Sequence, residues 1–300
     1  MLADQLPQRR SILVLPGSQP RFFAKAASST ADGVVLDLED SVAPAARETA
    51  RRAIIAALPA HDWSGKYRTV RVNAMSTPWC YQDVIAVVEG AGAWLDALVL
   101  PKVNHPHELI VLATLLDQIE AAHGLTRPIL IEAQIETAAG LAQVEAIAGS
   151  SPRLAALVFG PGDLAASLGM PVLGIGTEDA SYPGHLWHAH LVRIVVAARA
   201  AGLQAVDGPY GAFSDLAGLQ SSAHRSRQLG YDGKWAIHPR QLDTINAAFS
   251  PTTAERARAQ ALLAAYEASE AAGHGALRHG GEMVDRASVA MARRVLGRKI

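Results

Sequence analysis

Short runs rich in Val, Ile and Leu alternate along the chain with longer, Ala-rich amphipathic segments. The short runs show little alternation of polar and apolar residues, which is typical of strands buried on both faces of a parallel sheet. The sequence predicts strands at residues 11–15, 33–38, 67–73, 97–101, 129–135, 154–159, 203–206 and 234–237. It predicts helices at residues 44–58, 79–90, 105–123, 137–148, 187–201 and 239–248.

Eight strands with their helices in about 250 residues favour a (β/α)₈ TIM barrel, and an open doubly wound sheet is the structural alternative. Two segments interrupt the alternation. Residues 170–186 are rich in Gly and Pro and predict an insertion after the sixth strand. Residues 251–300 predict a helix, a Gly- and His-rich hinge at 274–281, and a second helix. We therefore expect a catalytic barrel over residues 1–250 and a C-terminal helical arm or lid over residues 251–300.

Composition narrows the class of protein. Half of the 300 residues are apolar, and 27 Lys and Arg balance 28 Asp and Glu, so neither nucleic acid nor a membrane surface is expected as the main partner. Cys80 is the single cysteine, which excludes an internal disulfide and a Cys-based zinc site. Asp4 argues against a signal peptide, and no apolar stretch has the length of a membrane span. We expect a soluble, cytoplasmic protein.

Polar residues stand at or just past the carboxyl ends of the predicted strands. They are Asp37, Glu39, Asp40, Arg71, Asn73, Lys102, Glu136, Asp163 and Asp207. In a barrel these strand ends converge on the face where barrel enzymes place their chemistry. Carboxylates gathered there repel one another and are costly to desolvate, and a bound cation would offset the repulsion. Oxygen donors without Cys or His at ligand spacing favour Mg²⁺ or Mn²⁺. The alternative is a structural network of ion pairs.

Eight motifs in the chain resemble one known family. They occur in the order RSILVLPGSQPRFFAKA, GVVLDLEDSV, VRVN, LVLPKV, QIETAAGL, LVFGPGDLAASLG, AVDGPYGAFSD and YDGKWAIHPRQL. Together they resemble the HpcH/HpaI aldolase–citrate lyase β-subunit family, whose members are Mg²⁺-dependent (β/α)₈ enzymes that cleave C–C bonds. The resemblance spans roughly residues 10–250 and continues into the tail. The segments around SYPGHLWHAHL, GKWAIHP and GGEMVDRASVAMARRVL are most similar to the malyl-CoA and β-methylmalyl-CoA lyases of that family.

The resemblance implies roles for residues on the carboxyl-end face. Glu136 and Asp163 correspond to the two carboxylates that bind the metal, and Arg71 to the arginine that holds the substrate carboxylate or its thioester oxygen. The acidic cluster that supports the metal's waters corresponds to Asp37, Glu39 and Asp40. An activated water held by Asp37 or Glu39 is the preferred base for the substrate hydroxyl.

Other implied roles concern the substrate and a second subunit. Arg21 and Lys25 correspond to basic positions near the CoA phosphates, and Lys102 lies on the substrate side of the same face. A small oxoacid carboxylate is expected to meet backbone N–H groups around Gly160, Pro161 and Gly162, except at Pro161, which has none. Asp285 corresponds to an aspartate that the tail of a neighbouring subunit delivers to the active site. A homotrimer or homohexamer follows from this arrangement.

The sequence departs from the family at two places that bear on the substrate rather than on the metal. Asn104 and His105 stand where the family usually has a more acidic stretch, and Gly162 stands where many members have Glu. The expected reaction is the cleavage of a malyl-CoA-type thioester to acetyl-CoA or propionyl-CoA and glyoxylate. A citramalyl-CoA lyase that releases pyruvate, a malyl-CoA thioesterase and a citrate lyase β subunit are the alternatives.

Several other residues are expected to be structural. We interpret His238 as a packing histidine, Cys80 as a buried structural thiol, and residues 252–273 as a packing or subunit-contact helix. A zinc site is disfavoured at His185, His188 and His190, because their spacing does not place all three on one helical face.

Overall fold

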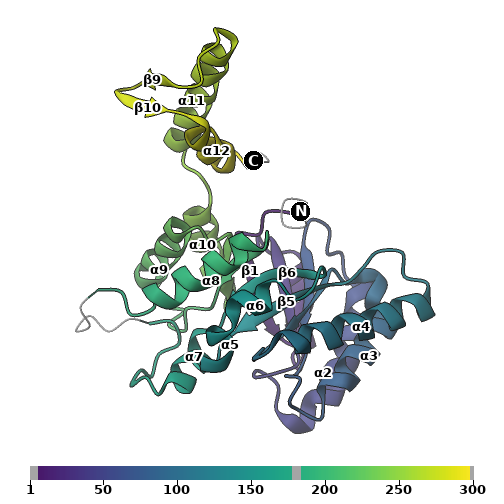
Figure 1. Ribbon diagram of the computed structural model, residues 1–300. Coiled ribbons are helices and arrows are strands. Elements are labelled where there is room, and N and C mark those ends of the chain that lie inside the picture. Colours follow the sequence, from purple (N-terminus) through teal and green to yellow (C-terminus); the bar gives the residue numbers. More distant parts are fainter. Residues whose placement is uncertain (1–5, 178–183, 298–300) are drawn as a thin grey trace. The chain divides into compact units, whose positions relative to one another are not determined.

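A computed structural model of the protein describes residues 6–177 and 184–297, and eight of the strands in these ranges close into a parallel barrel in chain order (Figure 1). They are β1 Ser11–Pro16, β2 Gly33–Asp37, β3 Tyr67–Arg71, β4 Ala97–Leu100, β5 Leu130–Ile135, β6 Leu154–Phe159, β7 Gln204–Asp207 and β8 Gly233–Ala236. Pairing of Ile12 with Gly33 on one side and with Trp235 on the other joins β1 to both β2 and β8. This closure confirms the barrel and excludes the open sheet.

Helices follow the strands and lie around the outside of the barrel (Figure 1). The α-helices are α1 Phe23–Ala27, α2 Arg47–Ala60, α3 Cys80–Ala91, α4 Pro106–His123, α5 Ala138–Ala142, α6 Val144–Ala148, α7 Pro161–Leu168, α8 His188–Ala200, α9 Leu216–Leu229 and α10 Leu242–Phe249. Short 3₁₀ turns are η2 Pro20–Phe22, η3 Pro44–Ala46, η4 Gly92–Trp94 and η5 Pro239–Gln241. No helix in the described ranges is long and apolar enough to cross a membrane.

Three helices were not predicted, and one predicted helix is divided. Helices α1 and α7 are short, and α9 has a polar sequence, LAGLQSSAHRSRQL, with a weak apolar stripe. The single helix predicted at 137–148 is two helices, since Gln143 at φ −116° interrupts it. The predicted insertion at 170–186 includes residues outside the described ranges, and Asp4 also lies outside them.

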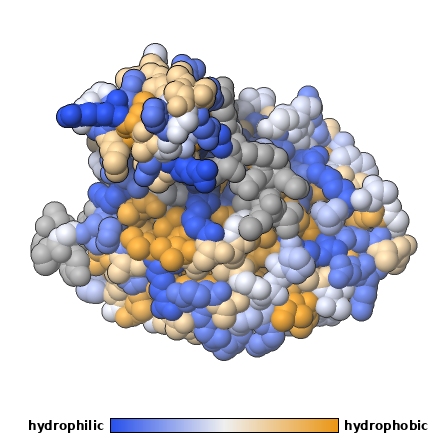
Figure 2. Space-filling view, turned by 45° about the horizontal axis from the view of Figure 1, so that its top comes forward, coloured by the Kyte–Doolittle hydropathy of each residue, from blue (hydrophilic) through white to orange (hydrophobic). Residues whose placement is uncertain are grey.

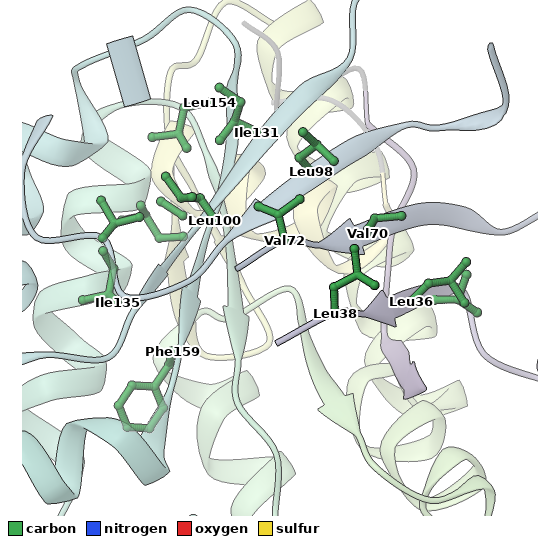
Figure 3. Packing of buried hydrophobic residues seen from close by; sticks show 14 of the residues in the cluster. Leu36, Leu38, Val70, Val72, Leu98, Leu100, Ile131, Ile135, Leu154 and Phe159 are labelled. Atoms are coloured by element: carbon green, nitrogen blue, oxygen red, sulfur yellow. The ribbon is translucent and has the colours of Figure 1, made fainter. Parts of the chain in front are cut away.

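Alternate residues of each strand are buried in two different layers, which explains the absence of polar alternation. Side chains such as Leu36, Val70 and Leu98 pack outward against the helices (Figure 3). Side chains such as Val35 and Val99 belong instead to a separate cluster inside the barrel. Because both faces of the strands are covered, apolar residues occupy consecutive positions.

The amino-terminal end of the barrel interior is filled by a buried ion pair. Arg9 contacts the Glu132 carboxylate, donates through Nε to Gln204 Oε1 at 2.9 Å, and lies 4.3 Å over the Tyr67 ring. Both charged residues are 1% exposed. A buried charge is tolerated when it is paired and hydrogen-bonded, as both charges are here.

The chain divides into two compact units, Met1–Phe249 and Ser250–Ile300. The second unit contains α11 Thr253–Ala271, the hairpin of β9 Leu277–His279 and β10 Glu282–Val284, and α12 Arg286–Val295. Its own core includes Leu263, Tyr266, Val284 and Val289. The predicted hinge at 274–281 is therefore wrong in part, because residues 277–279 pair with 282–284 as an antiparallel hairpin.

Candidate active site

Asp37 and Arg71 form the centre of the charged cluster at the carboxyl ends of the strands. They are the last residues of β2 and β3 and stand opposite each other in the strand register. Arg71 donates to both carboxylate oxygens of Asp37, from Nε at 2.6 Å and from Nη2 at 2.8 Å. Burial opposes ionisation of Asp37, but the Arg71 charge and its hydrogen bonds outweigh burial and lower the Asp37 pKa. Asp37 is therefore a permanent anion that orients Arg71.

Glu39, Asp40 and Lys102 surround the free edge of Arg71. Arg71 Nη1 lies 2.9 Å from Glu39 Oε2 and 3.4 Å from Asp40 Oδ2. Lys102 Nζ contacts Glu39 and lies 3.3 Å from Asp40 Oδ1. Burial and the neighbouring Asp40 raise the pKa of Glu39 to about 7, against the opposing effect of Arg71. This carboxyl group can therefore exchange a proton near neutral pH.

The Glu136 side chain is held in place by close contacts with neighbouring strand ends and loops. It follows β5, is 1% exposed, and accepts a 2.8 Å hydrogen bond from the Lys102 backbone N–H. Its other oxygen accepts from the Gln134 side chain. A Cβ atom at Gly160 would lie 2.3 Å from Glu136 Oε2, so only glycine allows this close approach. Burial, with repulsion from Asp163 and Glu39, raises the pKa of Glu136 to about 8.

Asp163 lies in the first turn of α7, where an acidic side chain is favoured by the helix dipole. One of its oxygens is 3.5 Å from Lys102 Nζ. The Gly160 N–H donates to Ile135 O at 3.1 Å, and Pro161 has no N–H. Of the three residues expected to offer backbone donors, Gly162 is therefore the one that can bring an N–H to a ligand at this turn.

The donor set fits a hard divalent cation. Asp37, Glu39, Asp40, Glu136 and Asp163 supply five carboxylates against the two cations Arg71 and Lys102, which leaves a formal excess of three negative charges. Among the described residues no group of three or more His, Cys, Asp or Glu side chains is arranged to hold a metal. A cluster of carboxylates without His or Cys suits an ion that takes few protein ligands and keeps waters, as Mg²⁺ does.

The structure removes Asp207 and Asn73 from this cluster. Asp207 is buried against the Lys234 ammonium at 2.5 Å and the Ser226 hydroxyl at 2.5 Å. Asn73 donates to Leu38 O at 3.1 Å and to the Asp83 carboxylate. For these two residues the structural interpretation is the better one.

The roles expected for Arg21, Lys25 and Asp285 rest on the family resemblance. Arg21 and Lys25 are exposed on η2 and α1, directly after β1. Asp285 belongs to the second unit, where it is the N-cap of α12 and accepts from the Ser288 N–H at 3.0 Å. The hydrogen bonds from Ser288 lower the pKa of Asp285. Their substrate roles stay predictions.

Two structural interpretations made from sequence bear on rival sites. His238 accepts from the Arg240 N–H and stacks on Phe213 at 5.0 Å, which confirms a packing role. Cys80 is buried, and burial together with Asp83 and Glu108 raises the pKa of its thiol to about 12, so it is unreactive. Gln134 and Thr137 were missed, although both flank Glu136 in the motif QIET.

Comparisons with known proteins identify the family of this chain. The family model for HpcH/HpaI aldolase/citrate lyase matches residues 10–239. The chain is 46% identical over 286 residues to an L-malyl-CoA/beta-methylmalyl-CoA lyase of Cereibacter sphaeroides, an alignment that covers 92% of this chain and 90% of that protein. It is 37% identical over 298 residues to a (3S)-malyl-CoA thioesterase of the same organism, over 99% of this chain and 96% of the relative.

A solved structure extends the likeness to nearly the whole chain. The protein CitE from Mycobacterium tuberculosis, in complex with magnesium, acetoacetate and coenzyme A, matches with a TM-score of 0.78 and 29% identity. The match covers 95% of this chain and 96% of that one. The family predicted from the motifs is thus confirmed, as is the prediction of an enzyme of the lyase class. This chain belongs to the HpcH/HpaI aldolase/citrate lyase family.

Proposed function

We propose that this chain is a Mg²⁺-dependent lyase that cleaves a β-hydroxyacyl-CoA of the malyl-CoA type to acetyl-CoA or propionyl-CoA and glyoxylate. The observation that carries the proposal is the partly buried cluster at the carboxyl ends of β2 to β6, with an excess of carboxylates and with Glu136 and Asp163 beside Arg71 and Lys102. The 46% identical lyase, by its name, acts on a thioester of this class.

Glu136 and Asp163 would hold the metal, with Mn²⁺ as a substitute for Mg²⁺. When bound, the ion supplies Lewis acidity that lowers the pKa of the substrate hydroxyl. Glu39, with a pKa of about 7, is the group best matched to take that proton, directly or through a water. Asp37 is bound on both oxygens by Arg71, which suits a positioning role better than a basic one.

Loss of the hydroxyl proton turns the C–O bond into a carbonyl and breaks the C–C bond, and the electron pair passes to the thioester as an enolate. Arg71 is the group to stabilise the enolate oxygen, because Asp37 fixes its orientation through Nε and Nη2. Its Nη1, which lies 2.9 Å from Glu39 Oε2, would turn from Glu39 toward the enolate oxygen. Such preorganised donors contribute several kcal/mol to transition-state stabilisation. Gly162 and Lys102 would meet the glyoxylate carboxylate, and Arg21 and Lys25 the CoA phosphates.

The enolate carbon then needs a proton, and Asp285 from a neighbouring subunit is the proposed donor. In its own unit Asp285 is held ionised by Ser288, which suits a base for the reverse condensation. For cleavage it must leave these hydrogen bonds and bind a proton.

We propose that the chain forms a homotrimer or homohexamer in the cytoplasm, and its exposed apolar side chains support self-association. Large apolar side chains at the surface include Leu173, Ile175 and Phe213, and the segments that carry the last two meet where the Gly211 N–H donates to Ile175 O. Apolar side chains gather in orange patches in Figure 2. Patches of this kind mark interaction sites.

The test is an assay of the purified protein with racemic malyl-CoA and Mg²⁺, with and without EDTA, in which glyoxylate is trapped as its phenylhydrazone. The proposal expects glyoxylate and acetyl-CoA in equal amounts, and loss of both in EDTA. Turnover that survives EDTA contradicts the metal role. Pyruvate from citramalyl-CoA without any reaction of malyl-CoA would move the substrate assignment to that thioester.

A malyl-CoA thioesterase is the second candidate, favoured by the 37% identical relative that carries this name. The same enolate-stabilising groups would polarise the thioester carbonyl while a water attacks it. Free malate and CoA without glyoxylate in the same assay would establish this activity instead.

A further inference from the structure

One amide side chain joins the two loops between which Glu136 is held. Asn104, in the loop after β4, donates from Nδ2 to Lys102 O at 3.0 Å. Its Oδ1 accepts from the Thr137 hydroxyl at 2.5 Å. Thr137 is the residue after Glu136, and Lys102 is the residue whose backbone N–H donates to Glu136. Asn104 therefore fixes both neighbours of this carboxylate.

The backbone at Lys102 needs such support. Its φ is +52°, and among the described residues it is the one non-glycine residue with a left-handed backbone. A long side chain adopts this conformation rarely, and it persists where the surroundings over-determine it. In this conformation the Lys102 N–H lies 2.8 Å from Glu136 Oε1, so the strained peptide aims a donor at the proposed metal ligand.

The other side of Glu136 is anchored through Thr137. Its hydroxyl is the N-cap of α5 and accepts from the Gly140 N–H at 2.9 Å while it donates to Asn104. A Cβ atom at Gly140 would lie 2.1 Å from Val103 O, so the two loops are in direct contact. A shift of the loop after β4 would therefore move Glu136 as well.

We infer that Asn104 is a positioning residue that holds Glu136 in the orientation required to bind the divalent ion. The inference rests on the proposed function, in which Glu136 is a metal ligand. A side-chain amide suits this position because the two contacts demand one donor and one acceptor. A carboxylate here could not donate to Lys102 O.

The test measures Mg²⁺ binding to the substrate-free protein by isothermal titration calorimetry for wild type, Asn104→Ala and Thr137→Val. Asn246→Ala is the matched control. Asn246 also bridges a hydroxyl and a carbonyl, accepting from Ser11 at 2.8 Å and donating to Thr30 O at 2.9 Å, at the amino-terminal end of the barrel. Thermal melting shows that each variant is folded.

We expect Asn104→Ala to weaken Mg²⁺ binding by about 10-fold or more, a loss typical of residues that orient a metal ligand. Thr137→Val should weaken binding to a similar degree, and the double variant little further, because the two residues share one link. Asn246→Ala should bind as wild type does.

Binding by folded Asn104→Ala and Thr137→Val that matches Asn246→Ala would overturn the inference and leave the metal proposal standing. Failure of the wild-type protein to bind Mg²⁺ would instead remove the metal ligands themselves, and the inference with them. With saturating Mg²⁺ the malyl-CoA turnover of Asn104→Ala should approach that of wild type, because its deficit lies in metal affinity.

Discussion

The two ends of the barrel interior both bury charge, but they balance it differently. At the amino-terminal end one cation, Arg9, meets one carboxylate, Glu132, and Gln204 accepts a further hydrogen bond from Arg9. At the carboxyl end five carboxylates share Arg71 and Lys102. The first arrangement is complete in itself, whereas the second has an excess of negative charge.

This difference in charge balance distinguishes a structural ion pair from a candidate catalytic site. Asp207 also ends its strand, β7, but it pairs with Lys234 near the start of β8, and we interpret this balanced pair as structural. Glu136 is buried as deeply as Glu132, but Glu132 contacts the Arg9 guanidinium, whereas Glu136 accepts hydrogen bonds from the uncharged Lys102 N–H and Gln134 amide. Charge imbalance, rather than burial or position alone, therefore indicates where an external cation is required.

The largest expected effect comes from neutralising Glu136. Glu136→Gln should lower Mg²⁺-dependent turnover of malyl-CoA by roughly 10³-fold or more, since one of two charged ligands is lost. The fold should persist, because Gln134 has an unpartnered Oε1 that can turn toward the new amide. Steady-state kinetics with a thermal melt measures both, and a variant that retains wild-type turnover would refute the metal assignment.

A variant at Asp285 tests whether a second chain completes the site with the excess of carboxylates. Asp285→Asn should reduce turnover by roughly 10²-fold, the range of a lost general acid. Co-expression with Glu136→Gln should restore part of the activity, because a mixed oligomer contains some sites with both intact residues. Mixed oligomers that stay inactive would indicate that Asp285 serves its own chain or only caps α12.

Neutralising a glutamate at the amino-terminal end of the barrel should lower stability rather than catalytic activity. Glu132→Gln leaves Arg9 as an uncompensated buried charge, which should lower the free energy of unfolding by about 3–5 kcal/mol. Urea denaturation followed by circular dichroism measures the loss. Turnover per folded molecule should match wild type, and a selective loss of turnover would show that this end also serves the reaction.

The pH dependence of stability tests the raised pKa of Glu136. Without metal, the folded state raises the Glu136 pKa from its ordinary value of 4.5 to about 8, so the neutral form is favoured on folding. That stabilisation is fully present below pH 4.5 and is lost as the pH rises toward 8. In EDTA, the free energy of unfolding of the wild type should fall by a few kcal/mol relative to that of Glu136→Gln as the pH rises over this interval. A difference that is independent of pH would contradict the raised pKa.

The sequence allowed the barrel and most of the cluster to be predicted, because strand positions and strand ends depend on local pattern. Asp37, Arg71, Lys102 and Glu136 lie together as that pattern indicates. Contacts between loops could not be predicted in the same way. That Asp207 turns to Lys234, or that the Gly160 N–H is used by Ile135, depends on which partner the fold brings near.

The smallest expected effect concerns Arg21 and Lys25, which are exposed and do not belong to the buried charges at either end of the barrel. Two solvent-exposed contacts with phosphates are each worth up to about 1 kcal/mol, so the double alanine variant should raise the KM for malyl-CoA by roughly 3- to 10-fold with kcat unchanged. The effect should fade with added salt, because screening weakens exposed charges most.

Replacing the exposed Arg52 and Arg193 with alanine removes equal charge from other helices and should leave KM unchanged. An equal rise in KM for both pairs would indicate general attraction of the anionic substrate rather than a CoA phosphate contact after β1.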